Sequence, residues 1–125
     1  MEDINVLINK SRLEKRIDEL AEEIQKDYQG KSIVLLGVLK GAVPFMWELA
    51  KRIKNDVELE FLLEHLKEKK PNSIKIATLL SKPSRRVIEL NVDYIGFKID
   101  DKFVVGYGLD YDQNLRNLPY IGYIE

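Results

Sequence analysis

Residues 32–61, SIVLLGVLKGAVPFMWELAKRIKNDVELEF, decide the fold class of this chain. Residues 32–39 are nearly all apolar, which is typical of a strand covered on both faces in a parallel sheet. Residues 39–55 continue as a helix that tolerates Pro44 in its first turn. Residues 57–61 alternate apolar and acidic side chains, as a strand does. Strand, helix and strand form a βαβ unit with a right-handed crossover, so the sequence predicts an α/β fold.

A long amphipathic helix is predicted before this unit, within residues 11–32, after a short apolar run at residues 6–8. Its apolar side chains recur at helical spacing: Leu13, Ile17, Leu20, Ile24 and Tyr28. Ser11 and Glu14 have the spacing of a capping box, and Gly30 is placed to end the helix. Further extended segments are predicted toward the C-terminus, within residues 73–81, 92–97, 102–109 and 118–124.

The composition limits the classes of function. A chain of 125 residues suffices for one domain with a real core, so we expect a single domain over residues 1–125. A net charge of -1 argues against a broad nucleic-acid surface. The absence of cysteine excludes disulfides, thiolate nucleophiles and Cys-ligated zinc. The sequence shows neither a signal peptide nor an apolar run long enough to span a bilayer, so we expect a cytoplasmic protein without a membrane partner.

The junction at residues 56–70, DVELEFLLEHLKEKK, contains no turn. The strand period of residues 57–61 changes directly to the helical spacing of Leu62, Leu63 and Leu66. Connections between such elements usually take roughly 2 to 6 residues, and a Ser, Thr, Asp or Asn cap usually begins the helix. The junction is either an unusual native connection or the trace of a lost segment.

Ligands of open α/β sheets bind beyond the carboxyl ends of the strands. The first candidate there is Leu39, Lys40 and Gly41, because free backbone N–H groups, a helix dipole and a lysine suit a phosphate or pyrophosphate. The alternative is a surface lysine beside a tight turn. A second candidate, residues 81–86, has three cations and two hydroxyl groups. The alternative for this segment is a solvated basic loop.

The third candidate is residues 101–111, in which Phe103 could stack on a flat ring and Asp110 could hold a divalent cation such as Mg²⁺. The alternative is a β-ribbon with core aromatic residues and an Asp in a turn. His65, the only histidine, has no partner at useful spacing, so a surface role is expected. A Ser-His-Asp triad or a hydrolase that depends on metal alone lacks its partners in this sequence.

Three stretches, in order along essentially the whole chain, closely resemble the hypoxanthine (guanine) phosphoribosyltransferases: GVLKGAVPF (37–45), IKIATLLSKPSRR (74–86) and VDYIGFKIDDKFVVGYGLDYDQNLRNLPYIG (92–122). The resemblance implies the type I phosphoribosyltransferase fold, a mostly parallel sheet flanked by helices. It also implies transfer of a 5-phosphoribosyl group from phosphoribosyl pyrophosphate (PRPP) to N9 of hypoxanthine or guanine, with release of pyrophosphate. Mg²⁺ on the donor and a homo-oligomer, commonly a dimer or tetramer, are further implications.

The resemblance also implies roles for single residues on the purine side of the site. Lys82 matches the lysine that donates a hydrogen bond to the 6-oxo group of the purine. Phe103 matches the ring that stacks on the purine, and Val104 the residue whose backbone contacts the purine edge.

On the donor side, Leu39, Lys40 and Gly41 match the pyrophosphate loop of the family, in which the Leu-Lys peptide is commonly cis. Such a bond is costly for a residue other than proline and persists only where the site enforces it. Asp110 matches an acid near Mg²⁺ and the purine 2-position, and Arg116 matches an arginine that binds pyrophosphate. Positive charge there would stabilise the leaving group.

One part of the family pattern is absent from this sequence. In the family, the strand matching residues 57–61 is followed by a mobile lid, further strands, and a loop that holds the ribose 5′-phosphate and supplies the aspartate thought to act on purine N7. The resemblance therefore implies a missing segment at about Leu62/Leu63, between an N-terminal part, 1–62, and a C-terminal part, 63–125. Part of the central sheet, the PRPP loop and the catalytic acid/base would all lie in it.

Three interpretations stay open. The first is a phosphoribosyltransferase whose given sequence lacks this segment, either because the segment is deleted or because the given sequence omits it; a true deletion would leave very low activity. The second is a non-catalytic remnant with weak purine or pyrophosphate binding, and the third is a structural or engineered scaffold without a ligand. An intact mass near 14.6 kDa would establish a true deletion.

Overall fold

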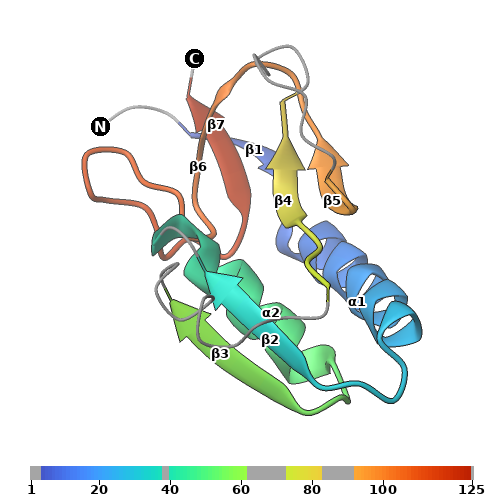
Figure 1. Cartoon of the computed structure of the whole chain (residues 1–125). Helices are drawn as coiled ribbons and strands as arrows, with labels where there is room; N and C mark the ends of the chain where they lie inside the picture. The colour runs from blue at the N-terminus through green and yellow to red at the C-terminus, as the bar shows by residue number, and fades with distance from the viewer. Residues whose placement is uncertain (1–3, 38–39, 62–72, 83–91, 125) are drawn as a thin grey trace.

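The computed structural model describes residues 4–37, 40–61, 73–82 and 92–124 (Figure 1). The described elements are, in order, β1 (Asn5–Ile8), α1 (Lys10–Asp27), β2 (Ile33–Gly37), the 3₁₀ helix η1 (Lys40–Ala42), α2 (Val43–Arg52), β3 (Val57–Phe61), β4 (Ala77–Ser81), β5 (Tyr94–Lys98), β6 (Phe103–Val105) and β7 (Ile121–Ile124). The predicted mixture of helices and strands is confirmed. The helix proposed near His65 lies outside the described residues.

The predicted βαβ unit is present as β2, α2 and β3. Strands β2 and β3 are parallel and in register from Ile33 opposite Val57 to Gly37 opposite Phe61. Pro44 lies at the start of α2, as predicted, because the first helical N–H groups need no partner within the helix.

The expectation that residues 32–39 are covered on both faces is wrong for β2. Ile33 packs in a core cluster together with residues of α1 and α2, and Leu35 packs against the same cluster. Val34 points to the opposite face of the strand and is 42% exposed. Among the described residues, only one face of this strand is packed, and the apolar run in the sequence did not indicate this.

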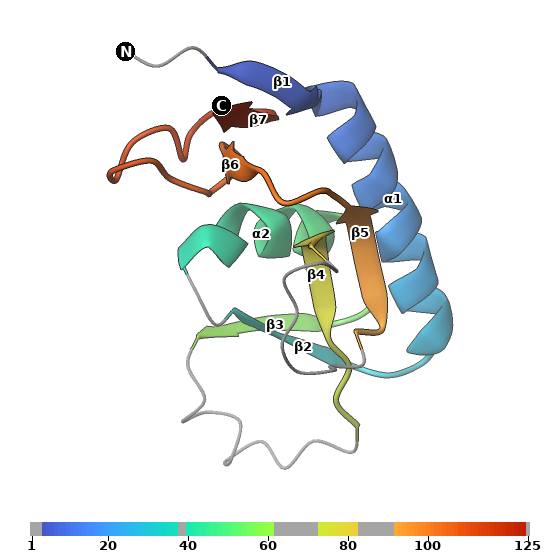
Figure 2. The ribbon, with the colours of Figure 1, turned by 90° about the horizontal axis from the view of Figure 1, so that it is seen from above.

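Strands β4 and β5 form a second parallel pair, with Ala77 opposite Tyr94 and Ser81 opposite Lys98. Among the described residues the two parallel pairs are separate two-stranded sheets, rather than neighbours in one sheet (Figures 1 and 2). Most strand pairing toward the middle of the chain is thus parallel, as predicted, but the pairs are not joined by a described strand.

A third sheet joins the two ends of the chain. Its strand order is β1-β7-β6, and both pairings are antiparallel. Ile8 of β1, Leu13 of α1 and Ile121 of β7 form a second buried cluster beneath it. Extended segments were predicted at β6 and β7, whereas β1 was seen only as a short apolar run, and the pairing across the whole chain length was not predicted.

Helix α1 begins with Asn9 as its cap, and the capping box predicted at Ser11 and Glu14 is wrong. The Asn9 side chain accepts a hydrogen bond of 2.8 Å from the Arg12 backbone N–H. A cap residue has an extended backbone, which Asn9 has with φ -76° and ψ 167°, whereas Ser11 already lies inside the helix. Gly30 has φ +76° just beyond the other end, consistent with its predicted role in ending the helix.

Helix α1 also connects the parts of the chain before and after the junction. Arg16 donates hydrogen bonds to the carbonyl oxygens of Ile95 and Gly96 on β5, at 2.8 and 2.9 Å. Near the end of α1, Asp27 accepts a hydrogen bond from the Tyr94 hydroxyl at 2.5 Å. Each of the two cores contains residues from both parts of the chain. Within the described residues, no helix is long and apolar enough to cross a membrane.

Candidate functional site

The long connection between β6 and β7, residues 106–120, approaches the segment between β2 and α2 (Figure 1). The two segments meet at a contact between Gly108 and Gly41. A Cβ atom on Gly108 would lie 2.5 Å from the Gly41 carbonyl oxygen and 2.9 Å from ring carbons of Pro44. Gly108 also has φ +97°, a conformation that side chains disfavour. Because neither residue carries a side chain, the backbone of the Lys40-Gly41 segment and the backbone of this connection come together.

Asp110 and Arg116 lie in this connection, close to that contact. Arg116 donates a hydrogen bond of 2.7 Å to the Gly108 carbonyl oxygen, and its second terminal nitrogen lies 3.4 Å from an Asp110 carboxylate oxygen. The other carboxylate oxygen of Asp110 accepts from the Gln113 N–H at 2.8 Å. Both charged side chains are about one-third exposed, so a ligand can reach them. The structure thus places Gly41, Asp110 and Arg116 in one neighbourhood.

Phe103 begins β6 and presents an exposed aromatic ring. The residue is 55% exposed. Its ring contacts that of Tyr111 edge-on, with centroids 5.9 Å apart and planes at 83°. Val104 follows on the same strand and is opposite Tyr123 of β7. The exposed Phe103 ring therefore lies next to the connection that carries Asp110.

Lys82 follows β4 directly and is half-buried. The Ile99 N–H donates to the carbonyl oxygen of the preceding residue, Ser81, at 2.8 Å, which fixes the ends of β4 and β5 side by side. Figure 1 shows that the end of β4 and the connection from β5 to β6 lie at the same end of the molecule. Lys82 forms no hydrogen bond or ion pair with the described part of the chain. It is therefore placed at a carboxyl strand end, as predicted.

Several predicted site residues lie outside the described residues. These are Leu39 with its peptide bond to Lys40, the side chain of Lys40, His65, and the basic residues Arg85 and Arg86.

The oxygen ligands that the described residues offer suit a Mg²⁺ ion that is held mainly by its substrate. No cluster of three or more His, Cys, Asp or Glu side chains occurs within the ranges that the structure describes. Mg²⁺ commonly takes one or two protein carboxylates and completes its shell with water and substrate phosphates. A carboxylate can accept about four hydrogen bonds or metal contacts. Asp110 receives one hydrogen bond and one ion pair among the described residues, so its oxygens fit such a role.

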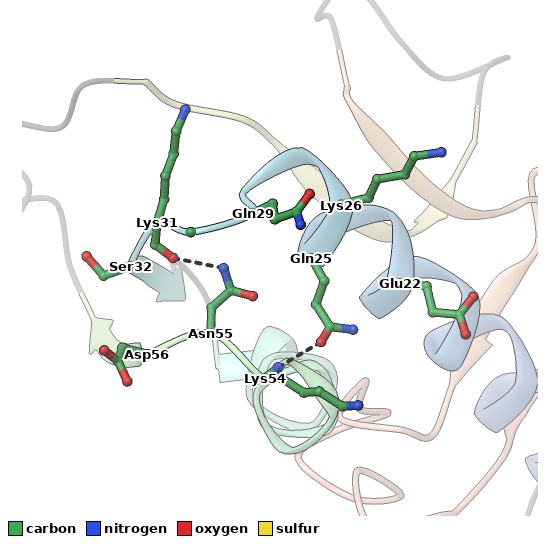
Figure 3. A pocket seen from close by; sticks show the side chains of 10 residues that line it. Glu22, Gln25, Lys26, Gln29, Lys31, Ser32, Lys54, Asn55 and Asp56 are labelled. Carbon is green, nitrogen blue, oxygen red and sulfur yellow. Dashed lines mark hydrogen bonds between the residues drawn. The ribbon is translucent and has the colours of Figure 1, made fainter.

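A separate open pocket lies at the other ends of β2 and β3, where α1 and α2 finish (Figure 3). It is lined by Glu22, Gln25, Lys26, Gln29, Gly30, Lys31, Ser32, Lys54, Asn55 and Asp56. Asn55 donates to the carbonyl oxygens of Tyr28 and Lys31, at 2.7 and 2.8 Å, so its amide serves to join two turns. None of the predicted site residues lines this pocket.

Sequence reasoning did not single out two features of the site. One is the approach of Gly108 to Gly41, for which the only signal is the glycine at each position. The other is the contact between Phe103 and Tyr111, whose signal is two aromatic residues on either side of a glycine-containing turn. Both arise from folding of the chain back on itself, which local patterns do not encode.

The phosphoribosyl transferase domain family matches residues 6–64 and 59–112 of this chain. The two matched segments overlap at residues 59–64, where the sequence changes period without a turn. The chain belongs to this family of phosphoribosyltransferases.

Its relatives in the family include the hypoxanthine-guanine phosphoribosyltransferase of Streptococcus pneumoniae, 34% identical over 166 aligned positions that cover 96% of this chain and 92% of the relative. Since 166 positions exceed the 125 residues of this chain, at least 41 positions of the relative face no residue here. Together with the divided family match, this finding confirms that an internal segment of the family is absent.

Solved structures of such enzymes share the fold. The hypoxanthine-guanine phosphoribosyltransferase of Bacillus anthracis is 32% identical, with a TM-score of 0.91 and full coverage of both chains. The Trypanosoma cruzi hypoxanthine phosphoribosyltransferase, solved in complex with the product IMP, is 27% identical with a TM-score of 0.86, covering 99% of this chain and 91% of that one. The predicted type I phosphoribosyltransferase fold is thereby confirmed.

Proposed function

We propose that this chain is a purine-salvage phosphoribosyltransferase, which transfers the 5-phosphoribosyl group of PRPP to hypoxanthine or guanine and yields IMP or GMP and pyrophosphate. The observation that carries the proposal is the contact of Gly41 with Gly108, because it gathers Asp110 and Arg116 beside the predicted pyrophosphate loop. The family of the relatives supplies the reaction class.

The purine base would bind at Phe103. An exposed, flat ring offers the stacking surface that a purine requires. The backbone of Val104 would contact the purine edge, and the Lys82 ammonium would donate a hydrogen bond to the 6-oxo group. The 6-amino group of adenine is itself a donor and could not accept this hydrogen bond from the Lys82 ammonium. Lys82 would therefore favour oxopurines over adenine.

The pyrophosphate of the donor would bind between Gly41 and Arg116. The Arg116 guanidinium offers a planar set of donors for phosphate oxygens, and it is already oriented by Gly108 and Asp110. Its charge would stabilise the leaving group as negative charge develops. Asp110 would supply one oxygen ligand for Mg²⁺, which when bound neutralises charge on the pyrophosphate.

The absent segment determines how well this chain can catalyse the reaction. The family resemblance places the ribose 5′-phosphate loop and the general acid/base in it, and at least 41 positions have no counterpart here. General acid/base groups typically contribute about 10²- to 10⁴-fold in rate. The 125-residue polypeptide should therefore transfer slowly while still binding purine and pyrophosphate. We prefer this to a purely non-catalytic role because the matched motifs on both sides of the site are retained.

The test compares two polypeptides in an assay of IMP formation from hypoxanthine, PRPP and Mg²⁺. One is the chain itself, and the other carries the missing segment of the Streptococcus pneumoniae relative between Leu62 and Leu63. We expect the restored chain to be at least about 10²-fold faster, and Phe103→Ala to abolish most of the gain. A folded restored chain without activity would contradict the proposal. High activity in a 125-residue chain of verified mass would refute the role given to the missing segment.

We further propose a single domain over residues 1–125, in which residues 1–62 and 63–125 fold together, as well as a cytoplasmic location and a homo-oligomer. Light scattering on the purified chain measures the oligomeric state. A monomer at assay concentrations would contradict the last proposal.

A further inference from the structure

Phe103 and Tyr111 form an exposed pair of aromatic rings. The two residues are 55% and 42% exposed, and the rings meet edge-on with centroids 5.9 Å apart. Phe103 comes from β6, whereas Tyr111 comes from the connection that also carries Asp110 and Arg116. Two adjoining large apolar groups in contact with water are typical of a surface that a ligand covers.

Tyr111 is held in position by a tight turn. Its backbone N–H and C=O both pair with Asn114, at 2.9 Å each, so that only two residues lie between them. These two residues, Asp112 and Gln113, have φ of +53° and +67°. Positive φ at both central positions defines a type I′ turn, in which Asn and Gly are preferred. A glutamine is strained there, so the turn requires support from outside itself.

The support comes from Asp110. Its carboxylate accepts a hydrogen bond of 2.8 Å from the Gln113 N–H, which lies inside the turn. The same carboxylate faces Arg116 at 3.4 Å. The residue that borders the predicted pyrophosphate site therefore also closes the turn that presents Tyr111 to Phe103.

An exposed phenylalanine samples several side-chain rotamers and loses this freedom when a ligand stacks on it. Edge-on contact with the ring of Tyr111, whose backbone the turn holds in place, reduces that loss in advance. From this geometry we propose that Tyr111 is a positioning residue for the purine base, acting through Phe103, whose ring it holds in the orientation for stacking. The inference rests on the proposed function, since it takes Phe103 to be the purine-stacking ring.

Calorimetric titration of the 125-residue chain with hypoxanthine, and separately with pyrophosphate in the presence of Mg²⁺, tests this role. We expect Tyr111→Ala to weaken hypoxanthine binding by about 2- to 10-fold, the range of an edge-on aromatic pair. The conservative variant Tyr111→Phe keeps the ring and should restore the affinity. Pyrophosphate affinity should stay unchanged in both variants, which separates positioning of the ring from general disruption of the loop.

A double-mutant cycle establishes whether Tyr111 acts through Phe103. Phe103→Ala alone should remove most hypoxanthine affinity, and adding Tyr111→Ala should cost nothing further. Unchanged hypoxanthine binding in Tyr111→Ala, an equal loss of pyrophosphate binding, or additive effects of the two substitutions would each overturn the inference while leaving the proposed function intact. Failure of both the natural and the segment-restored chain to bind hypoxanthine would instead refute the proposed function, and the role of Tyr111 with it.

Discussion

The carbonyl oxygen of Gly41 lies 2.5 Å from the point that a Cβ atom on Gly108 would occupy. These residues are far apart in the sequence, and each belongs to a different candidate loop. Their contact lets the segment after β2 and the connection between β6 and β7 form one surface. The functional proposals for Asp110 and Arg116 depend on this contact.

Gly108→Ala should therefore destabilise the chain more than Gly30→Ala. Both glycines have positive φ, +97° and +76°, so an alanine at either position costs about 1 kcal/mol in backbone strain. A Cβ at Gly30 meets nothing within 4 Å, whereas one at Gly108 overlaps Gly41 and Pro44 and should add about 1 to 3 kcal/mol. Urea unfolding measures both losses, and equal values would contradict the importance of the contact.

Arg116→Lys should weaken pyrophosphate binding by about 10-fold, because a single ammonium cannot reproduce the paired donors of a guanidinium and each charged hydrogen bond contributes roughly 1.5 to 3 kcal/mol. Hypoxanthine binding should change little. Arg52→Lys is a matched control, since Arg52 pairs with Asp18 and Glu48 at the other end of α2. Calorimetry that shows the same pyrophosphate affinity in all three proteins would exclude Arg116 from the site.

The cap of α1 can be tested by paired substitutions. Asn9→Ala should lower the free energy of unfolding by about 1 kcal/mol, because the Arg12 N–H loses its acceptor. Ser11→Ala should change it by less than about 0.5 kcal/mol, as for other surface positions. Thermal or urea unfolding provides the comparison. A larger effect at Ser11 than at Asn9 would favour the capping box that the sequence suggested.

The contact between Asp27 and Tyr94 should make stability depend on pH in the acid range. The Tyr94 hydroxyl hydrogen bond, with a smaller contribution from Lys75, lowers the pKa of Asp27 below its ordinary value of 3.8. A carboxylate with a lowered folded-state pKa contributes stability above its unfolded pKa, and this contribution is lost as pH falls through the folded-state pKa. Tyr94→Phe should thus be less stable than the natural chain at neutral pH, with a smaller difference in acid.

Urea unfolding of both proteins across this pH range measures the effect, with Tyr120→Phe as a control for loss of a tyrosine hydroxyl. A difference between the natural chain and Tyr94→Phe that stays constant from neutral to strongly acid pH would show that Asp27 is not responsible.

The sequence was sufficient to predict most of the described elements, β1 and η1 excepted, because the others follow from local patterns. Helix α1 and the unit β2-α2-β3 follow from hydrophobic periods, and Pro44 and Gly30 mark helix ends. Pairing between distant strands was not predictable in this way. Strand β1 pairs with β7 although they stand at opposite ends of the chain, and the choice of partner depends on burial around Ile8 and Ile121.

For the candidate site, too, the residue types could be predicted from the sequence, whereas contacts between distant segments could not. Residue types and the family resemblance suggested Gly41, Phe103, Asp110 and Arg116, and the structure brings Gly41, Asp110 and Arg116 together. Their roles stay predictions until binding is measured. The ring contact of Tyr111 could not be predicted, because it depends on a two-residue turn with positive φ at residues that rarely adopt it.

Tyr107 links the connection between β6 and β7 to both buried cores. It lies between Gly106 and Gly108 in this connection. Its side chain packs against both buried cores, and burial raises its pKa to about 12. Its N–H also donates to the Leu118 carbonyl oxygen across the connection, at 2.9 Å. Local unfolding of the connection between β6 and β7 would therefore disturb the packing of both cores. A compound that binds there should raise the melting temperature of the entire chain by mass action. Candidate purines and phosphates can then be ranked by thermal shift, even in a polypeptide too slow for an enzyme assay.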